Sequence, residues 1–288
     1  MDSNTENPAT AARAGETALH EASEKDAMSA VEVLGPPPRA ASKVWIARLI
    51  SMLVVIGGWE VLGRRVSPVF LSYPSAIAKA AVAMALSGEL TGALAMSLQT
   101  LVVGFLLASL IGVVLGLLIG RYKIVDAATD WLINALYATP LVAIIPLVIL
   151  WFGLGNGAKL FIVTILAVFP VLINTAAGVR NVPQSLIDVS TAFAANERQV
   201  FMKIILPAAV PYMMTGLRLG IGRAIIGMVV AEFFTAITGL GAVIVKYGNQ
   251  YDTASMFVPI LVLMLLGIVL TYGVRRLEEM FAPWRNVD

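Results

Sequence analysis

Six apolar segments, each long enough to cross a lipid bilayer, limit what this chain can fold into. A membrane helix needs about 20 mostly apolar residues. The chain is 59% hydrophobic and only 13% charged, whereas a soluble domain is about a quarter charged. We therefore expect an all-α, polytopic membrane helix bundle with six transmembrane helices. The six segments cover residues 44–63, 96–120, 132–151, 160–177, 212–234 and 257–272.

Several classes of function are excluded by composition. The net charge is +2 and no basic cluster has interleaved aromatics, so nothing indicates a nucleic-acid partner. The chain has no cysteine, which excludes disulfides, thiolate metal sites and cysteine nucleophiles. The single histidine, His20, lies in a polar N-terminal region. A histidine-based catalytic or metal site within the membrane is therefore excluded as well.

The distribution of lysine and arginine predicts the orientation of the chain, because cytoplasmic loops carry an excess of both. With the N-terminus inside, the excess falls on the inner side, apart from Arg64 and Arg65. We expect a multi-pass membrane protein with both termini in the cytoplasm. The inner residues are Lys43, Arg48, Arg121, Lys123, Arg180, Arg198, Lys203, Arg218, Arg275, Arg276 and Arg285, and the outer ones are Arg64, Arg65, Lys79, Lys159 and Lys246.

Two segments outside the spans differ from them in composition. Residues 1–43 are rich in Ala, Ser, Glu and Asn and do not begin like a signal peptide, so we expect a disordered cytoplasmic tail. A solvated extension is favoured over a regulatory role for this tail. Residues 74–86 begin with a proline, are rich in alanine and include Lys79. They predict an interfacial helix rather than a span.

Small residues and prolines mark the inner spans. Four glycines of the second span recur at multiples of four, a spacing that lets helix backbones approach closely. This pattern indicates helix packing and says little about function. The third span contains Pro140 and Pro146 and the fourth contains Pro170, which predict kinks. The four glycines are Gly104, Gly112, Gly116 and Gly120.

Charged residues within the spans are few. Glu60 lies near the outer end of the first span, where snorkelling to the interface is the favoured interpretation. In the fifth span, Arg218 and Arg223 lie toward the inner part and Glu232 toward the outer end, where it can face the bundle interior. No series of buried carboxylates resembles a proton or sodium relay. This argues against a carrier that is driven by an ion gradient.

The chain also lacks a site for using ATP. Residues 153–159 are glycine-rich but lack the Gly-Lys-Ser/Thr ending that a phosphate-binding loop requires. No Gly-x-Ser-x-Gly hydrolase motif occurs either. We therefore expect no catalytic residue, no metal and no cofactor on this chain.

A polar segment from Asp188 to Pro207 lies between the fourth and fifth spans, on the predicted cytoplasmic side. It predicts two short helices, residues 188–195 and 197–205, and Pro207 is expected to end the second. Apolar residues of the second helix share one face and predict either a surface for a partner or packing onto the chain's own bundle. These residues are Val200, Phe201, Ile204 and Ile205.

This segment resembles the EAA loop of ABC importer permeases, which reads Glu-Ala-Ala, three residues, Gly, nine residues, Ile-x-Leu-Pro. Asp188, Ser190 and Ala194 stand at the first Glu, the second Ala and the Gly, and the spacing is the same throughout. Ile204, Leu206 and Pro207 match outright. The nitrate/sulfonate/taurine-type permeases are the most similar over residues 44–285, with matching stretches at 146–153, 174–180, 216–219, 231–233 and 239–241.

The resemblance implies a type I ABC importer permease fold in the bacterial inner membrane and a set of partners, with ATP and Mg²⁺ bound only by a partner ATPase. A loop of about residues 183–207 would dock on a cytosolic ATPase dimer, two permease copies would form the path, and an extracytoplasmic binding protein would deliver a small solute, an anion such as a sulfonate, taurine or nitrate. The implied coupling residues are Asp188, Ser190, Ala194, Asn196, Phe201, Ile204, Leu206 and Pro207. Candidates for the path or core are Pro140, Pro146, Asn174, Arg218, Arg223 and Glu232.

Two points stay open in this interpretation. Alanine tolerates positive φ poorly, so Ala194 predicts that the turn between the loop helices moves to Asn196. A stand-alone carrier or channel is the alternative function, and uptake by the chain alone, without ATP, would support it. A membrane enzyme is disfavoured as a third alternative, because no histidine or cysteine lies within the spans.

Overall fold

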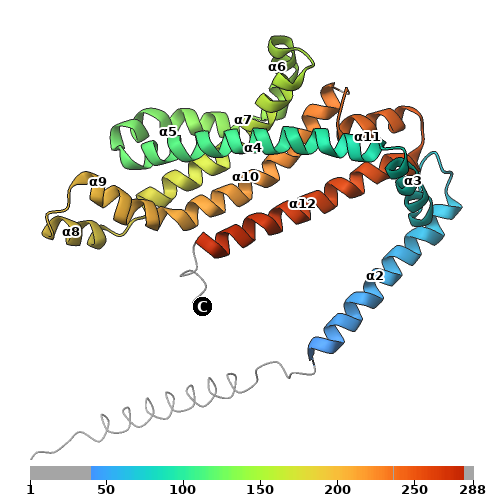
Figure 1. The fold of residues 1–288 in the computed structure, drawn as a ribbon, viewed down its shortest axis with the longest axis horizontal. Coiled ribbons are helices and arrows are strands. Elements are labelled where there is room, and N and C mark those ends of the chain that lie inside the picture. Colours follow the sequence, from blue (N-terminus) through green and yellow to red (C-terminus); the bar gives the residue numbers. More distant parts are fainter. Residues whose placement is uncertain (1–39, 236, 282–288) are drawn as a thin grey trace, which may run out of the picture. The chain divides into compact units, whose positions relative to one another are not determined.

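Helices form every regular element in residues 40–235 and 237–281, the part of the chain that the structure, a computed structural model, describes (Figure 1). The chain divides into two compact units, residues 1–59 and 60–288. The elements are α2 (Ala40–Arg65), α3 (Pro74–Leu86), α4 (Glu89–Arg121), α5 (Lys123–Ala138), η1 (Leu141–Ile144), α6 (Ile145–Phe152), α7 (Asn156–Arg180), α8 (Gln184–Ala192), α9 (Glu197–Val200), η2 (Phe201–Ile205), α10 (Leu206–Thr235), α11 (Leu240–Asn249) and α12 (Thr253–Phe281). The predicted tail of residues 1–43 lies outside the described residues except for 40–43, which belong to α2.

Five helical segments are long and apolar enough to cross a membrane, namely α2, α4, α7, α9 to α10 taken together, and α12. The expected third span, residues 132–151, is not one continuous helix. It is a pair of helical pieces, α5 and η1 with α6, that are bent by 82° to each other. Thr139, before Pro140, is extended, with ψ at 135°. Proline disfavours a helical residue before it, so the break falls there rather than as a mild kink.

Helix α7 forms the centre of the second unit, because it packs along both α4 and α10. The four glycines of α4 lie along α7. A Cβ atom on Gly104 would stand 2.6 Å from Val163 Cγ1, and one on Gly120 would stand 2.6 Å from Val179 Cβ. Gly112 and Gly116 approach Val171 and Thr175 in the same way. The two helix axes can be this close only because these positions carry no side chain.

Helix α3 coincides with the predicted interfacial helix. Pro74 stands in its first turn, and Ile77 and Met84 are buried. Glu60 does not simply extend to an interface: its carboxylate accepts the Ser75 N–H at 3.0 Å and the Ser75 hydroxyl at 2.7 Å. The negative charge at the start of α3 satisfies an otherwise free backbone donor there. Glu60 therefore fixes the end of α2 to the start of α3.

Candidate functional site

The segment between α7 and α10, residues 181–205, is called the loop segment here and defines the loop end of the bundle. The opposite end, where α4 and α7 begin, is the far end. The loop segment contains α8, a turn, α9 and the π-helical turn η2. The first helix spans Gln184–Ala192, so it begins four residues before the predicted start at Asp188. Asp188 is exposed, and its Oδ1 accepts the Gln184 side-chain amide at 2.9 Å.

The turn of the loop segment falls at Ala194 and not at Asn196, so the expected shift is wrong. Ala194 has φ of 52°, in the left-handed region. Asn196 is extended and caps α9: its Oδ1 accepts the Gln199 N–H at 2.9 Å, and the Gln199 side chain accepts the Asn196 N–H at 2.9 Å. This capping box satisfies two donors at once. Because the cap holds Asn196 in an extended conformation, Ala194 adopts the strained left-handed conformation of the turn.

Pro207 does not end the second loop helix, contrary to the prediction. Residues Glu197–Thr235 form one helical segment of 39 residues. Proline in an α-helix clashes with the carbonyl four residues earlier and lacks a donor. The π-helical turn at residues 201–205 changes the hydrogen-bond register just before Pro207, with the Leu206 N–H donating to the Phe201 carbonyl. The loop segment is thereby continuous with a membrane-length helix.

The apolar face of the second loop helix packs onto the chain's own bundle. Ile205 is buried with Val179, Val182 and Ala209, and Val200, Phe201 and Ile204 pack against this cluster. Of the two alternatives left open for this face, folding back is the observed one. Other apolar side chains of the loop segment point outward: Leu186, Val189, Phe193 and Met202 are exposed, and Phe193 is 82% exposed.

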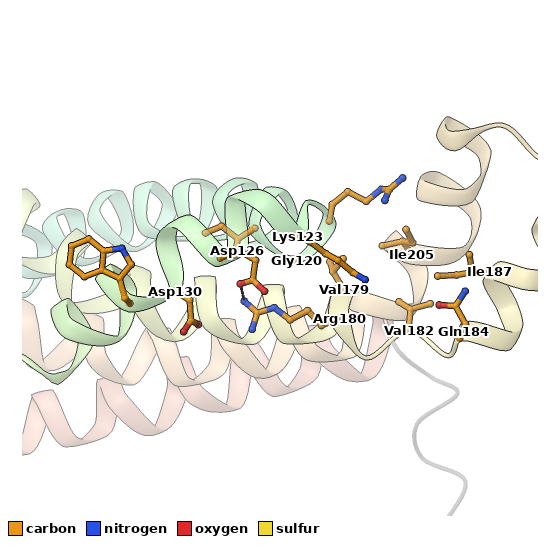
Figure 2. A pocket seen from close by; sticks show the side chains of 14 residues that line it. Gly120, Lys123, Asp126, Asp130, Val179, Arg180, Val182, Gln184, Ile187 and Ile205 are labelled. Atoms are coloured by element: carbon orange, nitrogen blue, oxygen red, sulfur yellow. Dashed lines mark hydrogen bonds and ion pairs between the residues drawn. The ribbon is translucent and has the colours of Figure 1, made fainter.

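A pocket of about 760 Å³ opens at the loop end, between the end of α4, α5 and the loop segment. Figure 2 shows Arg180 of α7 reaching Asp126 of α5, with which it forms an ion pair, and Lys123 nearby. Apolar side chains of the loop segment close the other side. The lining residues are Ile119, Gly120, Arg121, Lys123, Asp126, Ala127, Asp130, Trp131, Val179, Arg180, Val182, Gln184, Ile187 and Ile205.

A second polar cluster lies at the far end and centres on Glu232, which is buried. Its carboxylate accepts the Ser97 hydroxyl at 2.7 Å and the Gly241 N–H at 2.8 Å. The Ser97 oxygen in turn accepts the Leu240 N–H at 2.8 Å. Gly239 has φ of 101°, and a Cβ there would stand 2.0 Å from Glu232 Oε1. The carboxylate thus fixes the first turn of α11 to α4 and α10.

Helix α11 is fixed to α4 at its other end as well. The Glu89 carboxylate accepts Lys246 Nζ at 2.6 Å and the Tyr247 hydroxyl at 2.8 Å. The hydrogen bond to Glu89 raises the pKa of Lys246 and that of Tyr247. In addition, Lys159 of α7 is 2% exposed, and its Nζ donates to the Thr238 carbonyl at 2.9 Å and hydroxyl at 2.7 Å. Lysine is almost never buried unpaired, so this contact also serves to position the chain before α11.

The predicted path or core residues do not form one cluster. Pro140 lies at the break after α5, and Pro146 stands in the first turn of α6. Asn174 donates to the Pro170 carbonyl of its own helix at 2.8 Å. Arg218 pairs with Glu278 of α12 at 3.1 Å, whereas Arg223 is exposed on α10. Glu232 is enclosed in the far-end cluster.

Comparison with known proteins decides the family. Residues 109–283 match the family model of the binding-protein-dependent transport system inner membrane component. The chain belongs to this family. It is an ABC importer permease, a multi-pass subunit of the inner membrane and not an enzyme.

Individual relatives cover much of the permease. It is 35% identical over 84% of its length to the putative aliphatic sulfonates transport permease protein SsuC of Bacillus subtilis, and covers 88% of that protein. It is 32% identical over 56% of its length to the formylaminopyrimidine transport permease protein ThiX of Halalkalibacterium halodurans, and covers 65% of it. Among solved structures, an inward-facing form of the MetNI methionine ABC transporter aligns at a TM-score of 0.49 and 21% identity, over 64% of this chain and 92% of that one.

Two features of the permease were not predicted from the sequence. The exposed apolar residues of α8 were missed, because the helical spacing of apolar residues is more regular in the next helix. The partnership of Ser97 with Leu240 and Glu232 joins residues more than a hundred positions apart. The one local signal was the pair Gly239 and Gly241 soon after Glu232, since glycines mark a close backbone approach.

Proposed function

We propose that this permease imports a small organic anion, that a separate cytosolic ATPase dimer grips its loop segment, and that two copies of the chain enclose the path. The observation that supports this most is the outer face of α8. Leu186, Val189 and Phe193 are exposed there, on a segment that continues into a 39-residue helix. Exposed apolar groups gathered on one element mark a contact surface.

The proposed orientation places the loop end in the cytoplasm, as the lysine and arginine distribution favours. ATP and Mg²⁺ then act only on the partner ATPase. The far end faces outward, where a binding protein delivers the solute. Both termini lie on the cytoplasmic side in this arrangement.

The continuous helix explains how a movement of the ATPase would reach the path. When the ATPase subunits close, they pull α8. The capping box at Asn196 and the buried Ile205 cluster transmit this displacement without a flexible joint. Residues 197–235 then move together, and α10 changes its position relative to the second copy. The path thereby switches between inward- and outward-facing states.

The test is co-purification of the ATPase with permease variants. Phe193→Asp is expected to abolish co-purification, because it places a charge within the contact surface without touching the bundle. Phe70→Asp is the matched control, since Phe70 is 81% exposed and lies at the far end, between α2 and α3. Phe201→Asp is expected instead to reduce the amount of folded protein, because Phe201 packs against the Ile205 cluster. Normal co-purification of Phe193→Asp would contradict the proposal.

The similarity to the putative aliphatic sulfonates transport permease protein SsuC of Bacillus subtilis supports the proposed substrate class. A related permease is named for formylaminopyrimidine, so uptake by the assembled transporter must be compared for both classes. We expect aliphatic sulfonates to be imported and formylaminopyrimidine not to be. Uptake by the permease alone, without ATP, would contradict the proposed dependence on an ATPase.

A further inference from the structure

Arg223 lies at the mid-height of the bundle rather than toward the inner part of the fifth span, where it was expected. The next residue, Ala224, is buried in a cluster with Ala108 of α4 and Ala167 of α7. These two alanines lie near the middle of the apolar segments 96–120 and 160–177. Twelve residues separate Arg223 from Thr235, about 18 Å at 1.5 Å per residue. An arginine side chain cannot extend that far to reach an interface.

The side chain of Arg223 faces away from its own bundle. Leu219 and Ile226, one turn before and one turn after it, are exposed on the same face of α10. Within residues 40–235 and 237–281, the Arg223 guanidinium makes no hydrogen bond or ion pair. Arg218 differs, because Glu278 neutralises it at 3.1 Å. Among the described residues, one arginine of α10 therefore has an acidic partner and the other has none.

Lipid is not a suitable neighbour for this face. A charge at mid-bilayer is costly, and such residues normally face a bundle interior or a water-filled cavity. In the proposed two-copy permease, this face of α10 then borders the path or the second copy.

The described residues of a second copy offer no free carboxylate at this height. Glu232 is buried in the far-end cluster. Glu278 is already paired with Arg218 of its own copy at 3.1 Å. The remaining acidic residues of the described chain lie near helix ends, in α5 at the loop end, or outside the spans. They are Glu60, Glu89, Asp126, Asp130, Asp188, Glu197, Asp252 and Glu279.

We propose that Arg223 of each copy lines the path and binds the anionic head of the solute, a sulfonate-type oxyanion, as it crosses the bilayer. This rests on the proposed function. The planar guanidinium offers two parallel donors to an oxyanion and is weakly hydrated, so it can exchange water for solute readily. Two such groups attract anions into the path and repel cations.

The cysteine-free chain permits a direct test by charge replacement. Arg223→Cys is made in the complete transporter, with its ATPase and binding protein, in proteoliposomes. Loss of a hydrogen-bonded charge is expected to lower aliphatic sulfonate uptake about tenfold or more. A cationic methanethiosulfonate reagent, which restores a positive charge at this position, is expected to recover uptake, whereas an anionic one is not. Arg223→Lys is expected to retain more uptake than Arg223→Cys.

Two cysteine controls fix the interpretation. Ile226→Cys lies on the same face, so we expect water-soluble reagents to modify it. Uptake by this variant is expected to be the same after the cationic and the anionic reagent. Leu110→Cys, on an exposed apolar face of α4, is expected to resist modification. Unaltered uptake by Arg223→Cys, absence of its modification, or equal recovery with both reagents would overturn the proposal. ATPase co-purification and ATP-dependent uptake by the wild type are measured in parallel, because their loss would instead overturn the proposed function.

Discussion

Replacing Gly239 by alanine tests the far-end cluster. The added Cβ would stand 2.0 Å from Glu232 Oε1 and 2.2 Å from its Cδ, so the carboxylate must move. Moving it breaks the hydrogen bonds from Ser97 and Gly241. Hydrogen bonds to a charged group contribute about 1.5–3 kcal/mol each. With φ at 101° and ψ at 177°, Gly239 also lies in a backbone region that glycine alone adopts readily, at a cost to alanine of about 1–3 kcal/mol. Gly239→Ala is therefore expected to lower the unfolding free energy by about 4–9 kcal/mol.

The matched control separates the backbone effect from the clash. Gly88 has φ of 79°, and a Cβ there would meet no atom within 4 Å. Gly88→Ala is therefore expected to lose only about 1–2 kcal/mol, the backbone contribution alone. Both variants are unfolded by sodium dodecyl sulfate titration in mixed micelles and followed by circular dichroism. Equal losses in the two variants would refute the claim that the Glu232 carboxylate occupies the space above Gly239.

Three further predictions concern the loop segment, the glycine seam and α11. Ala194→Gly is expected to raise the unfolding free energy by about 0.5–1 kcal/mol, because relief of the left-handed strain exceeds the added unfolded-state entropy; a loss in the same titration would contradict the turn assignment. Gly116→Ala is expected to lose about 1–3 kcal/mol, because its Cβ would stand 2.7 Å from the Leu172 carbonyl, whereas Gly92→Ala, in open space on the same helix, is expected to lose nothing. The hydrogen bond to Glu89 raises the pKa of Lys246, so the ion pair stabilises the fold at neutral pH and this stabilisation is lost as pH rises beyond 10.5. The difference in unfolding free energy between wild type and Lys246→Met is therefore expected to shrink above that pH. A difference that stays constant with pH would contradict the role of the ion pair.

Local sequence rules predicted the helix bounds correctly where a single residue determines the backbone conformation. Pro74 and the alanines after it predicted α3 with its observed bounds. The same rules failed at Pro207, where a π-helical turn admits the proline and the helix continues. The break at Pro140 was expected as a kink within one helix. The angle of 82° between the two pieces depends on how α6 packs. The hydrophobic periodicity of the sequence carries no information about that packing.

The candidate site was predictable in position but not in its contacts. The spacing of Ile204, Leu206 and Pro207 located the loop segment. Which of its apolar faces is free depends on Val179 of α7 and on Val182, which lies just after that helix, because both cover Ile205. Ala194 adopts the strained turn because Asn196 is engaged in a cap. Such competition between neighbouring residues is decided by the whole fold.

Cross-linking from α8 to the ATPase tests the central claim most directly. The chain has no cysteine, so Phe193→Cys and Phe70→Cys each carry one reactive thiol. In membranes that hold the assembled transporter, with each thiol carrying a photoreactive group, illumination is expected to join Phe193→Cys to the ATPase and to leave Phe70→Cys unjoined. ATPase cross-linked equally through both positions, or through neither, would contradict the account.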